Sequence, residues 1–350
     1  MVSSHFPKDM PMDSETSQFL AEECMPEGGH KVPEDWSYVI LMDPLRIPTE
    51  ANLGSKSSIS GVEIPKKSGG KHTPARLVYG ISFFRNVPDP TVPRGAIQKA
   101  VLVLLYRSFF LLLKPVLREA HSKLIQLQQR PESFDKSITV ASILEQLFYG
   151  LEDSLSKNVP AFTIWEQKFI LDIPIVLDRD PVLDVDEEKM SSEMISPPKT
   201  AIAKAWNLDP IPGVSVLNFI KLFKSETMLI WKAVLFRLRI LFVGPSGDSV
   251  GSCCLVCPYL ILPLEVPFLN IYPYVPLAYM SPLETSCYIA GATNPITKMR
   301  KDLFDVCGDV NSKEILVSNS SLKLSSKEKS FIRKILNEID KGTVENLEEW

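Results

Sequence analysis

The chain has 350 residues, of which 45% are hydrophobic and 23% are charged, and its formal net charge at pH 7 is -4. This length allows a large buried core and one to three domains. The composition is that of a globular protein and excludes a largely disordered one. The acidic balance argues against a protein that tracks a nucleic-acid backbone, since such a protein needs a basic face.

The N-terminal segment, residues 1–34, is polar and acidic and shows no helical or strand periodicity. It is expected to be a disordered tail, and it lacks the apolar region of a secretory signal. The six cysteines stand at positions 24, 253, 254, 257, 287 and 307, four of them within apolar runs. Cysteines in such runs behave as small hydrophobic residues, which favours reduced thiols and a cytoplasmic protein.

Strand-like runs come first along the chain, and two amphipathic helices follow. The expected strands are Trp36–Met42, Gly61–Ile64, Arg76–Phe84 and Val101–Leu105. The expected helices bury one stripe from Leu113 to Leu127 and another from Val140 to Leu155. This order predicts an α+β unit in which helices pack on an antiparallel sheet.

One apolar run, Ala100–Leu113, raises the question of a membrane span. It is shorter than the roughly 20 residues that a spanning helix needs, and Arg107 and Ser108 interrupt it. The longer run Ser252–Met280 contains five prolines, which one helix could not accommodate. No transmembrane segment is therefore expected.

Residues 161–213 change in character and are expected to link two units. A strand candidate lies within Trp165–Leu177, and the acidic, serine-bearing stretch Asp178–Thr200 is predicted to be a solvated loop.

The segment from Ser215 to Ile296 is the most strongly patterned part of the chain. The spacing of its apolar residues predicts one helix over 216–234 and a buried strand at Ile240–Val243. A glycine turn, Gly244–Gly251, and a second strand at Cys287–Ala292 follow. This alternation indicates a sheet covered by helices.

The final helix is predicted from a capping box, in which Ser325 precedes Glu328 by three residues. The residues expected on its buried face are Phe331, Ile332, Ile335, Leu336 and Ile339.

The glycine turn lies where phosphate-binding loops lie, between a strand and a helix. It lacks the Lys-Ser/Thr ending of a Walker loop and the spacing of a dinucleotide site, and Asp248 would repel a phosphate. An ordinary strand-to-helix turn is the favoured interpretation.

The cysteines Cys253, Cys254 and Cys257 include a C-x-x-C spacing, but a zinc site needs a second pair of ligands, and Cys287 and Cys307 stand alone. Because Leu255 and Val256 lie between these thiols, a buried helix is favoured over a metal site or, if the thiols were exposed, an acylation site.

Other polar side chains also favour structural roles. The histidines at 5, 30, 72 and 121 are not near a nucleophile motif, and His121, close to Arg118 and Lys123, is expected on a solvated helix flank. Glu187 and Glu188 lie in the acidic loop. No catalytic residue, metal ligand or cofactor is expected.

Arg237 and Arg239 flank Leu238 just before the buried strand. They are favoured as caps for the carbonyl groups at the end of the preceding helix, and contact with an acidic partner is the alternative.

The sequence resembles the DENN domain superfamily, most closely the LCHN-type branch of small DENN proteins. The central resemblance is carried by LIWKAVLFRLRILFVGPSGDSVGSCCLVCPYL, then YPYVPL, then SPLETSCYIAGATNPI. The block from GVEIPKKSGGKHTPARLVYG to KAVLVLLYR resembles the same branch, as do LFDVCGDV and LKLSSKEKSFIRKIL near the end.

This resemblance implies an α/β fold with a longin-like lobe at 35–160, the linker at 161–213 and a three-layer α/β/α central lobe at 214–324. Residues 325–350 would be a shortened third part. It implies guanine nucleotide exchange on a Rab-type small GTPase in membrane trafficking. The alternative is a scaffold that binds a GTPase or trafficking partner without exchange.

The implied protein is cytoplasmic, with peripheral attachment to an intracellular membrane. Its GTPase-binding residues remain unassigned. The nearest candidates are the loop Phe84–Arg94 and the turns beside the 215–296 segment.

Overall fold

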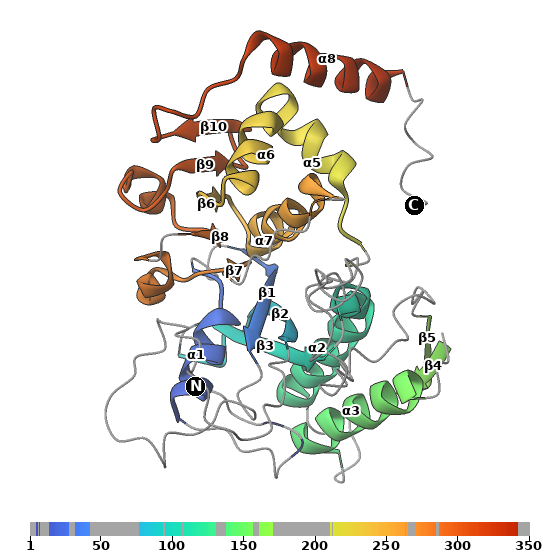
Figure 1. Ribbon diagram of the computed structural model, residues 1–350. Helices are drawn as coiled ribbons and strands as arrows, with labels where there is room; N and C mark the ends of the chain where they lie inside the picture. Colours follow the sequence, from blue (N-terminus) through green and yellow to red (C-terminus); the bar gives the residue numbers. More distant parts are fainter. Residues whose placement is uncertain are drawn as a thin grey trace, which may run out of the picture.

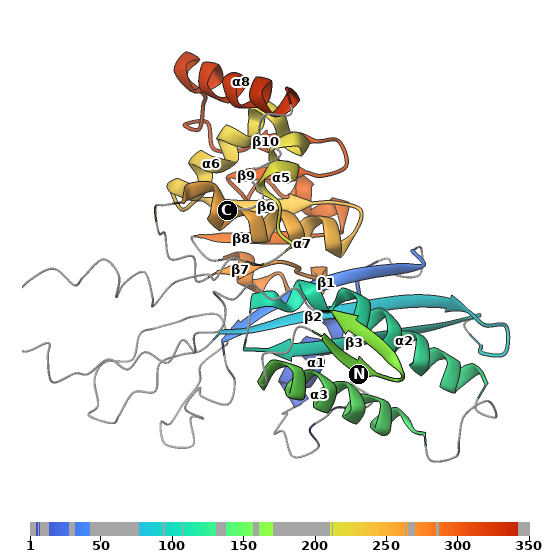
Figure 2. The same cartoon turned by 90° about the vertical axis from the view of Figure 1, so that its right-hand side faces the viewer.

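The computed structural model describes residues 14–27, 32–42, 77–93, 95–106, 108–130, 138–156, 161–170, 213–262, 270–284 and 287–341, together with residues 5, 7, 211 and 264. In this part of the chain, strands form a three-stranded sheet, a five-stranded sheet and a separate hairpin. The five-stranded sheet lies above the three-stranded one in both views (Figures 1 and 2).

The N-terminal sheet consists of β1 (Glu34–Met42), β2 (Leu77–Pro88) and β3 (Ala96–Leu105), antiparallel and in that order. Trp36 lies opposite Phe83, and Phe83 lies opposite Val101. Three of the four strands expected here are therefore confirmed, whereas Gly61–Ile64 lies outside the described residues.

Two helices cover this sheet, as the amphipathic stripes predict. After a 3₁₀ turn, η3 (Ser108–Leu113), come α2 (Lys114–Gln129) and α3 (Val140–Ser156). Leu117 of α2 and Leu147 of α3 share one core with Ile81 of β2. The hairpin of β4 (Ala161–Ile164) and β5 (Gln167–Ile170) adds Ile164 to this core.

The prediction of a disordered tail is wrong for α1 (Ser14–Glu23). Leu20 and Cys24 are buried, and the Ser37 hydroxyl donates to the Glu23 carbonyl at 2.7 Å. Glu27 also accepts from the Leu277 amide at 2.6 Å. Packing against distant segments stabilises this helix. A strong apolar periodicity in its own sequence is therefore not required, and the sequence shows none.

The central sheet has the order β10-β9-β6-β8-β7 and is parallel except for β10. Its strands are β6 (Arg239–Val243), β7 (Ile271–Tyr272), β8 (Tyr288–Ala292), β9 (Val306–Asp309) and β10 (Glu314–Val317). The expected strands at 240–243 and 287–292 are confirmed, and β6 is the middle strand. Its apolar run matches a strand that is buried on both faces.

Side chains of β6 alternate between two cores. Ile240 and Phe242 pack with Phe219 and Ile230 beneath the α-helices, whereas Leu241 and Val243 pack with Leu283 on the other face. The first layer contains α5 (Val216–Phe223), α6 (Thr227–Leu235), α7 (Gly247–Val256) and the 3₁₀ helix η8 (Cys257–Ile261). The second contains the 3₁₀ helices η9 (Leu277–Tyr279), η10 (Ser281–Glu284) and η11 (Pro295–Met299).

The single helix expected over 216–234 is interrupted, which corrects that prediction. A 3₁₀ turn, η7 (Lys224–Glu226), separates α5 from α6, and Lys224 has a φ angle of 49°. The apolar period continues across the break because both halves cover the same sheet, so the pattern alone does not reveal the interruption.

The last helix, α8 (Ser326–Asp340), begins with the predicted capping box between Ser325 and Glu328. Ile332 and Ile339 are buried, but Phe331 is 56% exposed, which corrects its expected place on the buried face. Within the described part of the chain, α8 packs mainly against α6 and η7.

None of the described helices is both long and apolar enough to cross a membrane. The suspected run Ala100–Leu113 forms the end of β3 and the turn η3.

Candidate functional site

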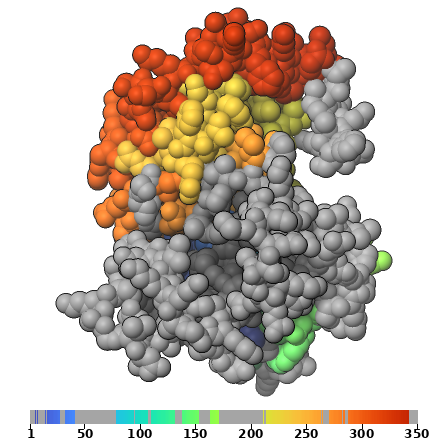
Figure 3. Space-filling model, viewed as in Figure 1, coloured from blue at the N-terminus to red at the C-terminus, as the bar shows by residue number. Residues whose placement is uncertain are grey.

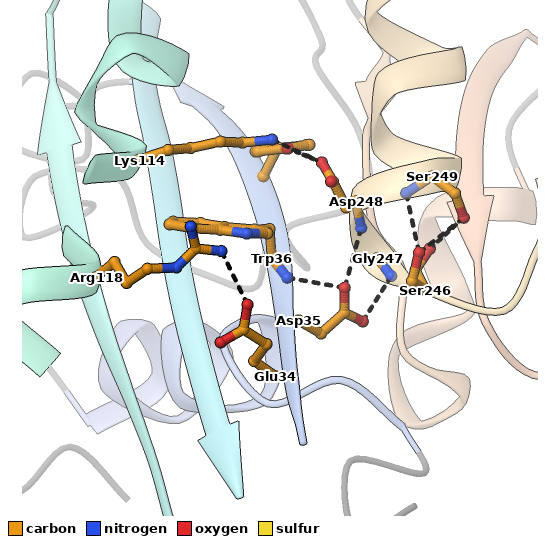
Figure 4. Close-up of polar contacts among 10 residues, drawn as sticks. Glu34, Asp35, Trp36, Lys114, Arg118, Ser246, Gly247, Asp248 and Ser249 are labelled. Atoms are coloured by element: carbon orange, nitrogen blue, oxygen red, sulfur yellow. Dashed lines mark hydrogen bonds and ion pairs between the residues drawn. The ribbon is translucent and has the colours of Figure 1, made fainter. Parts of the chain in front are cut away.

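The two sheets meet where the edge strand β1 lies against the beginning of α7. We call this junction the seam and define it by Glu34, Asp35, Trp36 and Tyr38 of β1, Lys114 and Arg118 of α2, and residues 246–249 at the start of α7 (Figure 4). The segments come from three distant parts of the sequence.

Asp35 links the two sheets through its buried carboxylate. One oxygen accepts the Gly247 amide at 2.8 Å, and the other accepts the Trp36 amide at 2.8 Å and the Asp248 amide at 3.3 Å. Burial raises the pKa of Asp35, and these backbone donors oppose that rise. The carboxylate therefore occupies the position at a helix N-terminus where an external anion would bind.

The start of α7 is also fixed by its own residues. The Ser246 hydroxyl accepts from the Ser249 amide at 3.2 Å, and the Ser249 hydroxyl donates to the Ser246 carbonyl at 2.8 Å. Ser246 is thus the N-cap of α7. The predicted strand-to-helix turn is confirmed.

Two glycines let α7 approach β1 closely. A Cβ atom at Gly247 would lie 2.4 Å from the Trp36 carbonyl oxygen, and one at Gly251 would lie 2.4 Å from the Tyr38 ring. The four-residue spacing places both glycines on one face of the helix. Side chains at these positions would force the two sheets apart.

Cationic side chains of α2 cover the aromatic residues of the seam. Lys114 Nζ lies 2.9 Å from Asp248 Oδ1 and 5.4 Å from the centre of the Trp36 ring. The Arg118 guanidinium lies 5.7 Å from the Trp36 ring and forms an ion pair with Glu34 at 2.8 Å. The Tyr38 hydroxyl donates to the same oxygen of Asp248.

The rim of the seam carries charges from both sides. The side chains of Glu34, Lys114, Arg118 and Asp248 are between 33% and 54% exposed. The arrangement offers alternating charges on a rigid support, which suits recognition of a protein surface.

The candidate segment Phe84–Arg94 was expected to be a loop, but Phe84–Pro88 are the end of strand β2, which corrects that prediction. Phe84 lies opposite Asp35 in the β1–β2 register, and the chain then turns between β2 and β3. Arg94 itself is not among the described residues. The seam thus includes a contact from the end of β2, where Arg85 lies 3.7 Å from Glu34, and the turn itself lies beyond it.

The three cysteines of the C-x-x-C run lie on α7 and the following 3₁₀ turn, inside the core of the central sheet. This confirms the expected buried helix. Burial raises the pKa of Cys253 to about 12 and holds those of Cys254 and Cys257 well above the usual value of a thiol. Such thiols are not accessible for acylation in this fold. In the described part of the chain, no three potential ligand side chains gather to hold a metal ion.

The prediction of a solvated His121 is wrong. The ring is fully buried, and Nε2 lies 3.0 Å from the Lys99 carbonyl oxygen, while Nδ1 has no partner. Burial lowers the pKa of His121 to about 4. The spacing does carry a sign of this burial, because His121 lies four residues after Leu117 and three before Leu124 and so shares their side of α2. The polar neighbours Arg118 and Lys123 led to the opposite expectation. His30, His72, Glu187 and Glu188 lie outside the described residues.

The arginines beside Leu238 differ from expectation as well. Arg239 forms an ion pair with Asp305 at 3.2 Å and donates to the Asp302 carbonyl at 2.6 Å, so it connects β6 to the β9 segment rather than capping α6. Arg237 ends α6 through its backbone, with a φ angle of 55°.

Sequence reasoning missed Asp35, Trp36, Lys114 and Arg118 as members of a site. One signal was present: Lys114 and Arg118 are four residues apart on an amphipathic helix and therefore share a face. Nothing in the local sequence shows that Asp35 reaches α7, because that contact spans more than 200 residues.

Two family models match this chain. The model described as Transport protein Avl9 matches residues 2–264, and the model described as Stabilization of polarity axis matches residues 213–319. The first covers more than half of the chain. The chain belongs to the Avl9 family.

Two curated relatives carry the name of the superfamily. DENN domain-containing protein 10 of Dictyostelium discoideum is 30% identical over 134 residues, which is 36% of each chain. DENN domain-containing protein 11 of Danio rerio is 28% identical over 136 residues, which is 35% of this chain and 27% of the relative. This chain thus spans about a third of the relatives that it matches.

These matches confirm that this Avl9-family chain is a member of the DENN superfamily, as the sequence blocks indicate. The LCHN-type branch stays a prediction.

Proposed function

We propose that this protein is a guanine nucleotide exchange factor that promotes GDP release from a Rab-type small GTPase in membrane trafficking. The observation that carries the proposal is membership of the Avl9 family, which is described as a transport protein, within the DENN superfamily. The composite rim of the seam supports it, since one partner could contact both sheets there.

Such an activity needs no nucleophile, metal or cofactor of its own. An exchange factor acts by binding the nucleotide-free GTPase more tightly than the GDP-bound form, which shifts the population toward the empty state. The proposed division into a longin-like lobe (35–160) and a central lobe (214–324) fits this mechanism, because a partner held by two rigid supports can be distorted between them. The proposed location is cytoplasmic, at the surface of an intracellular membrane.

We expect the GTPase to contact the seam rim together with the turn between β2 and β3. The Arg118 side chain is 54% exposed and lies next to Trp36, so reversal of its charge alters the rim while most of the core stays intact. Fluorescent GDP release from a panel of purified Rab proteins is the measurement. Arg118→Glu should slow the release stimulated by the wild-type chain at least about tenfold, the effect of about 1.4 kcal/mol.

Lys168→Glu, an exposed change on β5 away from the seam, serves as the matched control and should leave exchange unaltered. Thermal unfolding of each variant separates loss of contact from loss of fold. Wild-type-like exchange by a folded Arg118→Glu variant would refute the proposed surface. Tight binding of a Rab protein without faster GDP release would instead support a scaffold, and an absence of both binding and release across the panel would refute both functions.

A further inference from the structure

The outer side of α8 and the neighbouring turn η7 form a basic end on an otherwise acidic protein. Residues 221–226 and 323–341 contain eight Lys or Arg residues and four Asp or Glu residues, whereas the whole chain has a net charge of -4. All eight cationic side chains are exposed. Two of the four acids are already paired, Glu328 with Lys232 and Glu338 with Lys341.

An aromatic ring stands among these charges. Lys327, Phe331 and Lys334 follow one another at four- and three-residue spacing, so they share one face of α8. Phe331 is 56% exposed, whereas Ile332 and Ile339 lie roughly 90° further around the helix and are buried. The exposed face of α8 therefore combines cationic side chains with one large apolar ring.

The position of α8 leaves this face accessible. The helix lies across one end of the molecule in both ribbon views, with no described element beyond it (Figures 1 and 2). In the space-filling view it forms the rounded top of the protein (Figure 3). The face is carried on the outside of a single helix and is not recessed between elements.

A broad anionic surface fits these features better than a nucleic acid or an acidic peptide. A nucleic acid would be repelled by the acidic remainder of the chain, whose net charge is -4, and a peptide usually needs a groove or a sheet edge. A helix with Lys and Phe on its free side can instead lie parallel to a lipid surface. Each Lys or Arg close to an anionic leaflet adds attraction, and a ring of Phe can enter the boundary between headgroups and acyl chains.

We propose that the outer face of α8, defined by Lys327, Phe331 and Lys334, docks on an anionic phospholipid membrane. Glu338 and Lys341 lie further along the same face and neutralise each other in an ion pair at 2.9 Å. With a few cations and one ring the association is weak, reversible and sensitive to salt. The inference deepens the proposed peripheral membrane location, on which it rests. It does not depend on nucleotide exchange.

The test is sedimentation of the purified chain with lipid vesicles in the absence of any GTPase. Vesicles of phosphatidylcholine with about 30 mol % phosphatidylserine should bind the protein at about 0.05 M salt and release most of it at about 0.3 M salt. Vesicles of phosphatidylcholine alone should not bind it.

Variants identify the surface. The double change Lys327→Glu and Lys334→Glu should weaken binding to the anionic vesicles at least tenfold, and Phe331→Ser should weaken it severalfold. Lys168→Glu and Met299→Ser, which alter an exposed cation and a 75% exposed apolar side chain elsewhere, should bind as the wild type does. Should the double Glu variant lose its helical circular dichroism, Lys327→Gln with Lys334→Gln replaces it and should shift binding in the same direction.

Equal binding to both kinds of vesicle, or undiminished binding by the folded α8 variants, would overturn the proposal. Salt-sensitive binding to heparin or nucleic acid without binding to anionic vesicles would also overturn it and would assign the face to another polyanion. Since the assay contains no GTPase, its failure would leave the exchange activity untouched.

Discussion

At the scale of single residues, surroundings determine what a polar side chain does here. Asp35 and Asp248 both lie at the start of α7, yet Asp35 is buried and accepts three backbone amides, whereas the Asp248 side chain is 40% exposed and binds Lys114. The first holds two sheets together, and the second forms part of an accessible rim. Their neighbouring residues in sequence do not distinguish them.

His121 gives a prediction about pH. Its pKa is about 4 in the folded protein, below the usual 6.5, because a protonated ring would place a second N–H in a buried site without an acceptor. The unfolded chain therefore binds more protons between these values, and the free energy of unfolding should fall by up to about 3 kcal/mol as the pH decreases from 6.5 to 4.

Urea unfolding at a series of pH values measures this effect. In His121→Leu the titrating group is absent, so the part of the slope that lies between pH 6.5 and 4 should shrink. An identical pH dependence in the wild type and the variant would show that carboxylates, and not His121, cause the acid sensitivity.

At the scale of elements, the helix end at Arg237 contains a strained residue. The Arg237 amide donates to Val234 and the Leu238 amide to Ala233, which is a Schellman arrangement with a non-glycine residue in the left-handed conformation. Glycine adopts this conformation without steric cost. Arg237→Gly should therefore be more stable than Arg237→Ala by about 1 kcal/mol.

The two variants form a matched pair, because both remove the side chain and its contact near Cys287. The difference between their urea midpoints measures the cost of placing a residue with a Cβ atom in the left-handed conformation at position 237. Equal midpoints would mean that the end of α6 relaxes to another conformation when the side chain is removed.

Most regular elements in the described residues could be predicted from periodicity, because burial of one face imposes it. This holds for α2, α3, β6 and the capping box of α8. The failures have a shared physical origin in tertiary contacts. α1 is held by distant partners, and the break at Lys224 preserves the apolar period. His121 is a polar residue on the buried side of α2, where the sheet and not its own side chain decides its exposure.

The candidate site was less predictable than the fold. The Gly244–Gly251 turn was found as a strand-to-helix connection, but its anionic partner Asp35 comes from β1. A local pattern reports which face of an element is buried and not which distant element covers it. The seam therefore depends on how the two sheets pack, which no local pattern encodes.

At the scale of the whole molecule, the seam should couple the stabilities of the two sheets. Asp35→Ala leaves the Gly247 and Asp248 amides without their acceptor, and we expect a loss of about 1–3 kcal/mol in the free energy of unfolding. Asp35→Asn keeps one acceptor oxygen and removes the cost of burying a charge, so its loss should be smaller.

Urea unfolding gives the free energies, and hydrogen exchange locates the effect. In Asp35→Ala, amides of β1 and of the first turn of α7 should exchange faster, while β6 and β8 in the centre of their sheet stay protected. Uniform acceleration across both sheets would show that the seam contributes to global stability without acting as a separate joint.

The close contact of α7 with β1 also affects how the protein aggregates when it is partly unfolded. Among the described strands β1 is an outer member of its sheet, and the helix lies over it through Gly247 and Gly251. An uncovered outer strand offers unpaired backbone groups to another molecule. If mild heating loosens α7, the exposed edge of β1 should pair with the same strand of another molecule. Turbidity should then appear below the unfolding temperature of the central sheet and should increase with protein concentration.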